Sequence, residues 1–200
     1  MTLHELRAQH SAQHSTHHTP DTTTTPRHPS WPTLPGSPEP YFLEAGDGER
    51  SVVGNELFTV LISGDETDGQ FGCFVMEGPA GEWVPAHSHD DVHEVFYVME
   101  GELEVRMDDR QGKRVKKVLA PGDFAFVPAG LVHNYHILTP RAKAIGVATG
   151  GFERFFHAVG LPTDLRGGIP PEPFFASPDV LREAGSRFRN THRPDIDLGS

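Results

Sequence analysis

Short apolar runs alternate with turn residues along most of the chain between residues 56 and 149. The predicted strands cover residues 57–63, 70–77, two strands within 94–107 that meet at Glu100 and Gly101, and then 115–119, 124–127, 133–138 and 143–149. Within residues 102–107 apolar and charged residues alternate strictly, so we expect one face of that strand to be exposed. Many short strands with frequent turns predict an all-β sandwich or barrel.

A different pattern follows the last predicted strand, in residues 152–159. Phe152, Phe155 and Phe156 are spaced so that they share one face of a short helix. Packing of these rings into the core is the simpler interpretation, and a cap over a pocket is the alternative. The sequence therefore predicts a barrel followed by a short helical segment.

The first forty residues have a composition unlike the rest of the chain, because they are rich in Thr, Pro, Ser and His. Their six histidines are His4, His10, His14, His17, His18 and His28. Irregular spacing without neighbouring carboxylates or thiols favours a polar tail over a metal-delivery segment. We expect residues 1–40 to be disordered, residues 41–160 to form the barrel with an N-terminal arm, and residues 161–200 to form a C-terminal extension.

The net charge of -11 argues against nucleic acids or anionic membranes as partners, because both require a cationic surface. Cys73 is the single cysteine, so no disulfide within the chain is expected. Neither an apolar run of about 18 residues nor a secretory leader is present, which predicts a cytoplasmic protein. A small-molecule partner fits these features best.

Candidate metal ligands lie in the segment around residues 87–94 and in a later strand. His87 and His89 alternate along a strand and therefore point to the same side. Glu94 opens the next strand, and His133 begins a remote one, so the four side chains are expected to meet. Imidazole and carboxylate ligands suit divalent transition metals, and the absence of a nearby thiolate argues against a purely structural zinc site. A His-x-His pair alone also fits two exposed residues, but the full set favours a metal centre.

Two longer motifs contain these residues. In residues 81–101 a glycine is followed after five residues by His87-x-His89, then after four residues by Glu94, and after six residues by a second glycine. This pattern resembles the first cupin motif without a mismatch. Residues 122–133 resemble the second cupin motif through His133, although Ile137 stands where the motif has asparagine. The resemblance implies a single cupin barrel, a double-stranded β-helix or jelly roll.

Within cupins, residues 40–160 resemble the small single-cupin bacterial quercetin 2,3-dioxygenases. The matching stretches include Pro40-Tyr41-Phe42, Pro85-Ala86-His87-Ser88-His89, Pro121-Gly122-Asp123-Phe124 and Phe152-Glu153-Arg154-Phe155-Phe156. This resemblance implies an enzyme that opens the central ring of flavonols such as quercetin with O2 and releases carbon monoxide and a depside. It also implies one divalent ion per chain (Ni, Co, Mn or Fe, with Cu or Zn as alternatives), and a homodimer.

In that family's terms, the three histidines are neutral ligands, while Glu94 both ligates the metal and accepts the proton of the flavonol 3-hydroxyl. Phe96, Tyr135 and Ile137 follow the ligands in steps of two and are candidate substrate contacts or ordinary barrel core. Two other functions remain open. One is another metal-dependent cupin oxygenase, cyclase or isomerase acting on a polyketide or phenolic, and the other is a non-enzymatic cupin that binds a small molecule.

Overall fold

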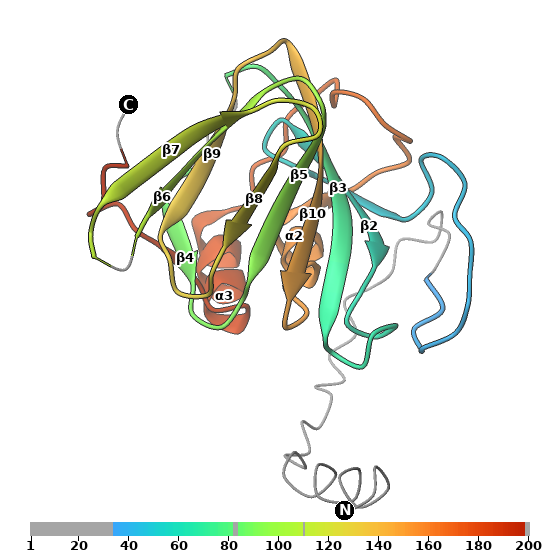
Figure 1. The fold of residues 1–200 in the computed structure, drawn as a ribbon. Coiled ribbons are helices and arrows are strands. Elements are labelled where there is room, and N and C mark those ends of the chain that lie inside the picture. Colours follow the sequence, from blue (N-terminus) through green and yellow to red (C-terminus); the bar gives the residue numbers. More distant parts are fainter. Residues whose placement is uncertain (1–33, 82–83, 110, 199–200) are drawn as a thin grey trace, which may run out of the picture.

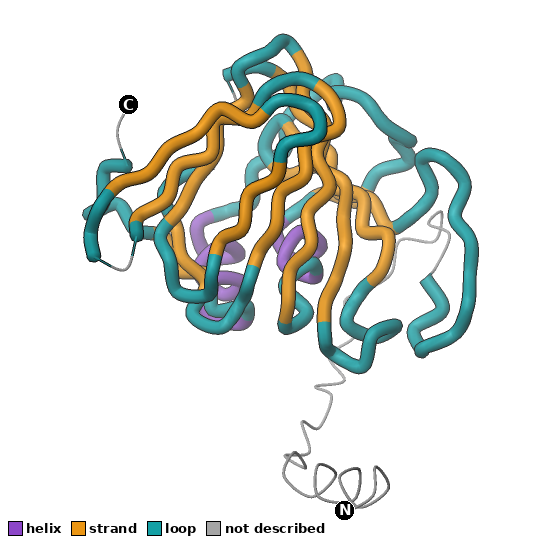
Figure 2. Tube along the Cα trace, viewed as in Figure 1, coloured by secondary structure: helices purple, strands orange, loops and turns teal. Residues whose placement is uncertain are grey.

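The computed structural model describes residues 34–81, 84–109 and 111–198. Within this part the chain forms two antiparallel sheets that face each other, with the helices together on one side of them (Figures 1 and 2). The prediction of an all-β jelly roll followed by a short helix is therefore confirmed. No helix in the described ranges is long and apolar enough to cross a membrane.

The larger sheet has seven strands in the order β11-β1-β2-β3-β10-β5-β8. These strands are β1 (Glu49–Val53), β2 (Glu56–Ile62), β3 (Phe71–Pro79), β5 (Glu94–Glu100), β8 (Phe124–Val127), β10 (Arg141–Thr149) and β11 (Leu161–Pro162). The long central pair, β3 and β10, stays in register from Phe71 opposite Thr149 to Pro79 opposite Arg141. This pair forms a continuous wall for the barrel interior.

The smaller sheet has five strands in the order β12-β4-β9-β6-β7. They are β4 (His87–His89), β6 (Leu103–Asp108), β7 (Arg114–Leu119), β9 (His133–Ile137) and β12 (Asn190–His192). Strand β4 has only three residues and lies between β9 and β12. The strand that carries two of the predicted ligands is therefore held by one partner from the barrel and one from the C-terminal part of the chain.

Aromatic rings fill the core between the sheets and helix α2 (Arg154–Val159). The ring of Phe156 stacks on that of Phe58, with centroids 4.0 Å apart, and meets the edge of Phe74 at 4.7 Å. The helix begins two residues later than predicted, because Phe152 is still in a turn and its N–H bonds to the Thr149 carbonyl. Phe152 nevertheless packs into the same core.

A close approach of β10 to this ring cluster depends on Gly146. A Cβ atom at that position would lie 2.3 Å from ring atoms of Phe74, well inside van der Waals contact. A glycine inside a strand is unfavourable by itself but allows another group to come near the backbone. Gly146 therefore makes room for the Phe74 ring against the β10 backbone.

The C-terminal part of the chain folds back onto the barrel. Helix α3 (Pro178–Arg187) has Pro178 in its first turn and Ser177 as N-cap, whose hydroxyl accepts a hydrogen bond from the Val180 N–H. After it, β12 pairs with β4. The segment expected as a C-terminal extension thus supplies a strand to the smaller sheet. Of the predicted disordered tail, residues 1–33 lie outside the described residues.

Candidate metal centre

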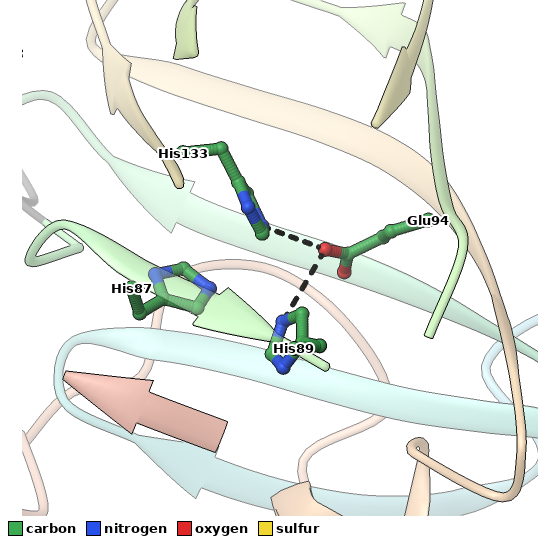
Figure 3. Close-up of side chains that lie close together, drawn as sticks. All are labelled: His87, His89, Glu94 and His133. Carbon is green, nitrogen blue, oxygen red and sulfur yellow. Dashed lines mark hydrogen bonds and ion pairs between the residues drawn. The ribbon is translucent and has the colours of Figure 1, made fainter. Parts of the chain in front are cut away.

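The four predicted ligands come from three strands in two sheets. His87 and His89 lie on β4, and His133 lies directly opposite His87 in the pairing of β4 with β9. Glu94 is the first residue of β5 and belongs to the facing sheet. Because side chains directly opposite each other in antiparallel strands share a face, the histidines converge on one point that the glutamate reaches from across the barrel (Figure 3).

One ligand atom from each of these side chains lies within 4.8 Å of the others. The Oε2 atom of Glu94 is 3.0 Å from Nε2 of His133 and 3.7 Å from Nε2 of His89. The ring of His87 lies 4.3 Å from that of His133 and 4.9 Å from that of His89, centroid to centroid. The four side chains are close enough together to hold a single metal ion.

Backbone carbonyls hold two of the imidazoles in a defined orientation. Nδ1 of His87 lies 2.8 Å from the Pro85 carbonyl, and Nδ1 of His133 lies 3.1 Å from the Leu131 carbonyl. A neutral imidazole that donates from Nδ1 keeps the lone pair of Nε2 for a metal, which is a usual outer contact of a metal-ligating histidine. The chain thus fixes the tautomer that a ligand needs.

The surroundings keep His87 and His89 uncharged. Burial, followed by repulsion from His133, lowers the pKa of His89 to about 3. Burial together with the charges of His133 and His89 lowers the pKa of His87 well below its ordinary value. A neutral imidazole is the form that binds a cation.

His89 provides the most direct test of whether the cluster fits a metal. Its ring is 1% exposed, and within the described residues neither Nδ1 nor Nε2 has a hydrogen-bond partner. Polar atoms in a protein interior nearly always have a partner, since leaving them without one costs about 1–3 kcal/mol. A metal ion bonded to the Nε2 atom that faces Glu94 would give one of these two atoms a partner, so the cluster fits a divalent cation.

A cavity of about 490 Å³ opens beside the cluster, and its walls are mostly apolar. His87 and Glu94 belong to its lining, and so do the predicted contacts Phe96 and Tyr135, whose rings meet edge to face at 5.7 Å. Ile137 is fully buried and lies outside the lining, because its side chain packs toward the backbone of Gly78 in β3. The structure thus places two of the three predicted contacts at the cavity.

The phenylalanines after the barrel have both roles that the sequence left open. Phe152, Phe155 and Phe156 line the cavity and also pack against the hydrophobic core. Ring stacking between Phe152 and Phe155, at 5.4 Å, continues the core into the cavity wall. Helix α2 is therefore at once part of the core and a cover of the pocket.

Sequence reasoning missed the contribution of the C-terminal part to this cavity. That contribution comes from Phe175, Leu181, Gly185, Asn190 and His192. His192 lies opposite His87, and Asn190 opposite His89, in the pairing of β12 with β4. A three-residue polar strand has no periodicity by which it can be recognised, so the printed sequence held no signal for it.

Two neighbouring histidines, His93 and His136, stay outside the cluster. Nδ1 of His93 accepts a hydrogen bond from the Ala129 N–H at 3.1 Å, and its ring stacks on Phe126 at 5.7 Å. His136 lies on β9 with its side chain on the opposite face from that of His133. His93 therefore acts as a packing residue that fastens the loop before His133.

Comparison with known proteins agrees with this geometry. Residues 74–145 match the family described as Cupin domain, and the barrel that carries the four-residue cluster is a cupin domain. The chain is 38% identical over 150 residues to quercetin 2,3-dioxygenase of Bacillus subtilis, which covers 74% of this chain and 41% of that protein. It is 26% identical over 130 residues to quercetin 2,3-dioxygenase of Aspergillus japonicus, which covers 63% of this chain and 37% of that enzyme.

The chain thus spans about two fifths of the length of these curated relatives. Among solved structures, oxalate decarboxylase from Bacillus subtilis superposes with a TM-score of 0.49 at 20% identity, covering 55% of this chain and 28% of that one.

Proposed function

We propose that this chain is a metal-dependent dioxygenase that cleaves the central ring of flavonols such as quercetin with O2, giving a depside and carbon monoxide. The observation that carries the proposal is the position of the His87, His89, Glu94 and His133 cluster at a largely apolar, ring-lined cavity. Similarity to two quercetin 2,3-dioxygenases supports the choice of substrate class. The cavity volume of about 490 Å³ is in the range typical of small-molecule sites.

The four clustered side chains would hold one divalent transition metal ion, for which Ni, Co, Mn or Fe are our first candidates and Cu or Zn alternatives. Such an ion supplies a positive charge that makes a bound hydroxyl more acidic and stabilises the resulting oxyanion. The protein contributes neutral imidazoles on one side and a carboxylate on the other. This arrangement leaves the side that faces the cavity for the substrate.

Glu94 is the residue to which we assign proton transfer. Its side chain is almost fully buried, it lines the cavity, and its Oε2 atom faces the histidines. A carboxylate at hydrogen-bond distance from the 3-hydroxyl of a flavonol accepts its proton and leaves an electron-rich flavonolate. Positioning of this carboxylate at the start of β5, rather than on a flexible loop, keeps it in place for the transfer.

The rings of the cavity wall suit a flat aromatic substrate. Phe96 and Tyr135 form one part of the wall, and the rings of helix α2 and its preceding turn form another. Aromatic side chains bind planar apolar molecules by burial and by stacking or edge-to-face contacts.

The proposed ring opening balances without a further reagent. Both oxygen atoms of O2 enter the depside, and the electrons come from the two carbon–carbon bonds that break. The reaction therefore needs no further reductant.

The first experiment combines metal analysis with a flavonol assay. Purified protein is depleted of metal, reconstituted with Ni, Co, Mn or Fe, and mixed with quercetin first under nitrogen and then in air. We expect loss of the flavonol absorbance and release of carbon monoxide only in air and only with metal. Bound metal without any reaction of quercetin would refute the proposed substrate class and point to another cupin enzyme.

A pair of variants tests the role of Glu94. Glu94→Gln removes the base, and we expect at least a hundredfold loss of kcat, within the range typical of general acid–base catalysis. Glu172→Gln makes the same chemical change at an exposed position far along the chain and serves as the control. Near-normal turnover by Glu94→Gln with a normal metal content would refute the assignment.

We further propose that the chain forms a homodimer through the outer face of β5 and β8. Tyr97, Phe124 and Phe126 are all substantially exposed there, and Tyr97 lies opposite Phe124 in the pairing of the two strands. Strand β8 is also the edge of its sheet, which leaves backbone groups available for a second chain. Sedimentation velocity tests this proposal, with Phe124→Lys expected to give a monomer. A wild-type monomer would refute it.

A further inference from the structure

A second polar group lies in the cavity apart from the metal cluster. The Tyr135 hydroxyl donates a hydrogen bond of 2.5 Å to Oε2 of Glu56, and both residues line the cavity. Glu56 is 2% exposed and Tyr135 is 6% exposed. A carboxylate buried in a mostly apolar cavity is unfavourable unless hydrogen bonds stabilise it, and the Tyr135 hydroxyl provides one such bond.

Tyr135 and Glu56 lie close to the four clustered side chains but apart from them. Tyr135 follows His133 by two residues on β9, so the two side chains share a face of the strand with their Cα atoms about 6.6 Å apart. Glu56 reaches the same region from β2 in the facing sheet. A planar ligand held at the metal cluster by one hydroxyl therefore extends along a wall that carries a second hydrogen-bonding group.

The backbone of β3 is shaped around Glu56. A Cβ atom on Gly78 would lie 2.7 Å from Cγ of Glu56 and 2.9 Å from Cδ1 of Ile137. Only glycine at this position lets the carboxylate lie against the strand while Ile137 fills the core behind it. Gly78 therefore leaves space within a central strand for the Glu56 side chain.

We propose that Glu56 and Tyr135 form a second binding site for the substrate, which accepts a phenolic hydroxyl remote from the one at the metal cluster. Glu56 acts as the hydrogen-bond acceptor, and Tyr135 is the positioning residue that holds its carboxylate. The inference rests on the proposed flavonol function and deepens it, because it selects flavonols with additional hydroxyl groups over 3-hydroxyflavone, which has none. A neutral hydroxyl donating to a carboxylate is a strong hydrogen bond in an apolar cavity.

The test is a binding measurement that does not depend on turnover. Protein loaded with zinc is titrated under nitrogen with quercetin and with 3-hydroxyflavone, and the two dissociation constants are compared by fluorescence quenching. We expect quercetin to bind at least tenfold more tightly to the wild-type protein, as is typical of one charge-assisted hydrogen bond. Galangin and kaempferol, which lack some of the quercetin hydroxyls, then identify the hydroxyl that is recognised.

Variants at the pair give the decisive comparison. In Glu56→Gln and Glu56→Leu the preference for quercetin over 3-hydroxyflavone should fall about tenfold, and in Tyr135→Phe it should fall by a smaller factor because the carboxylate loses its orientation. Glu172→Gln repeats the change from glutamate to glutamine at an exposed position and should keep the wild-type preference. Using both Gln and Leu at position 56 keeps the test valid if one variant fails to fold.

The outcomes separate this inference from the proposed function. A preference that depends on Glu56, in a protein that does not oxidise quercetin, supports the second binding site and refutes the dioxygenase. Turnover of quercetin with a preference unchanged in both Glu56 variants supports the dioxygenase and refutes the second site. Equal binding of quercetin and 3-hydroxyflavone by the wild-type protein also refutes it.

Discussion

The buried imidazole of His89 makes a quantitative prediction about the metal-free protein in acid. Its pKa is lowered from an ordinary 6.5 to about 3 in the folded chain, chiefly by burial. The unfolded chain therefore binds a proton on this residue at pH values where the folded chain does not. As the pH falls from about 6.5 to about 3, this difference progressively lowers the free energy of unfolding. Above pH 6.5 it has no effect on stability. Replacing His89 with a group that does not titrate should remove this part of the acid sensitivity.

The expected size of the effect follows from the two pKa values. One unit of pKa corresponds to about 1.4 kcal/mol, so lowering the pH from about 7 to about 4.5 costs the wild-type protein roughly 2.5 kcal/mol through His89. Compared with a total stability of about 5–15 kcal/mol for a domain, the effect is large enough to measure.

Urea denaturation of metal-free protein at both pH values provides the measurement. We expect the free energy of unfolding of His89→Gln to fall by roughly 2.5 kcal/mol less than that of the wild type over this pH range. His89→Asn differs in size but also lacks a titrating group, so it should show the same pH dependence even if its absolute stability differs. A wild-type pH dependence in both variants would show that the His89 imidazole is not held neutral in the fold.

Three further predictions follow from the packing. Phe156→Ala should lower the free energy of unfolding by about 3–5 kcal/mol, because it removes the ring stacked on Phe58, and urea denaturation measures the loss. Gly146→Ala should destabilise the protein by about 1–3 kcal/mol in the same assay, since its methyl group overlaps the Phe74 ring; an unchanged midpoint would contradict the tight packing. Deleting the chain from Arg189 onward removes β12, the outer partner of β4, and should weaken metal binding about 10–100-fold in a competition titration while the barrel stays folded. Unchanged metal affinity would show that β4 holds its shape without β12.

The sequence was sufficient for the barrel and for the convergence of the four clustered side chains, because both follow from local regularities. Alternation along the strands assigned the interior face, and the spacing of His87, His89 and Glu94 around a turn brought them to one end of the barrel. His133, on a remote strand, was added as the residue that completes the ligand set and matches the second cupin motif. The two-residue period of a strand is enough to predict which side chains face the interior, provided that the strand itself is recognised from the sequence.

Polar residues that are buried in the fold were much harder to anticipate. Strand β1 begins with three polar residues, Glu49, Arg50 and Ser51. Their polarity predicts exposure, yet all three are buried. Their burial depends on partners far along the chain: the Glu49 carboxylate pairs with Arg154, and the Ser51 hydroxyl is 3.0 Å from Nδ1 of His157. Such pairs have no signature in local sequence, and the same holds for the Glu56 carboxylate.

The pairing of β4 with β12 has a consequence for the order in which this protein matures. His89 lies opposite Asn190, about 100 residues further along the chain. During synthesis, the strand that carries His87 and His89 therefore waits for several seconds without one of its two neighbours, at translation rates of about 5–20 residues per second. Contacts of such long separation form late because closing the intervening loop is entropically costly. Pairing of β4 with β12 is thus expected among the last contacts of the barrel to form, so the strand that carries His87 and His89 gains its second neighbour only at the end of folding.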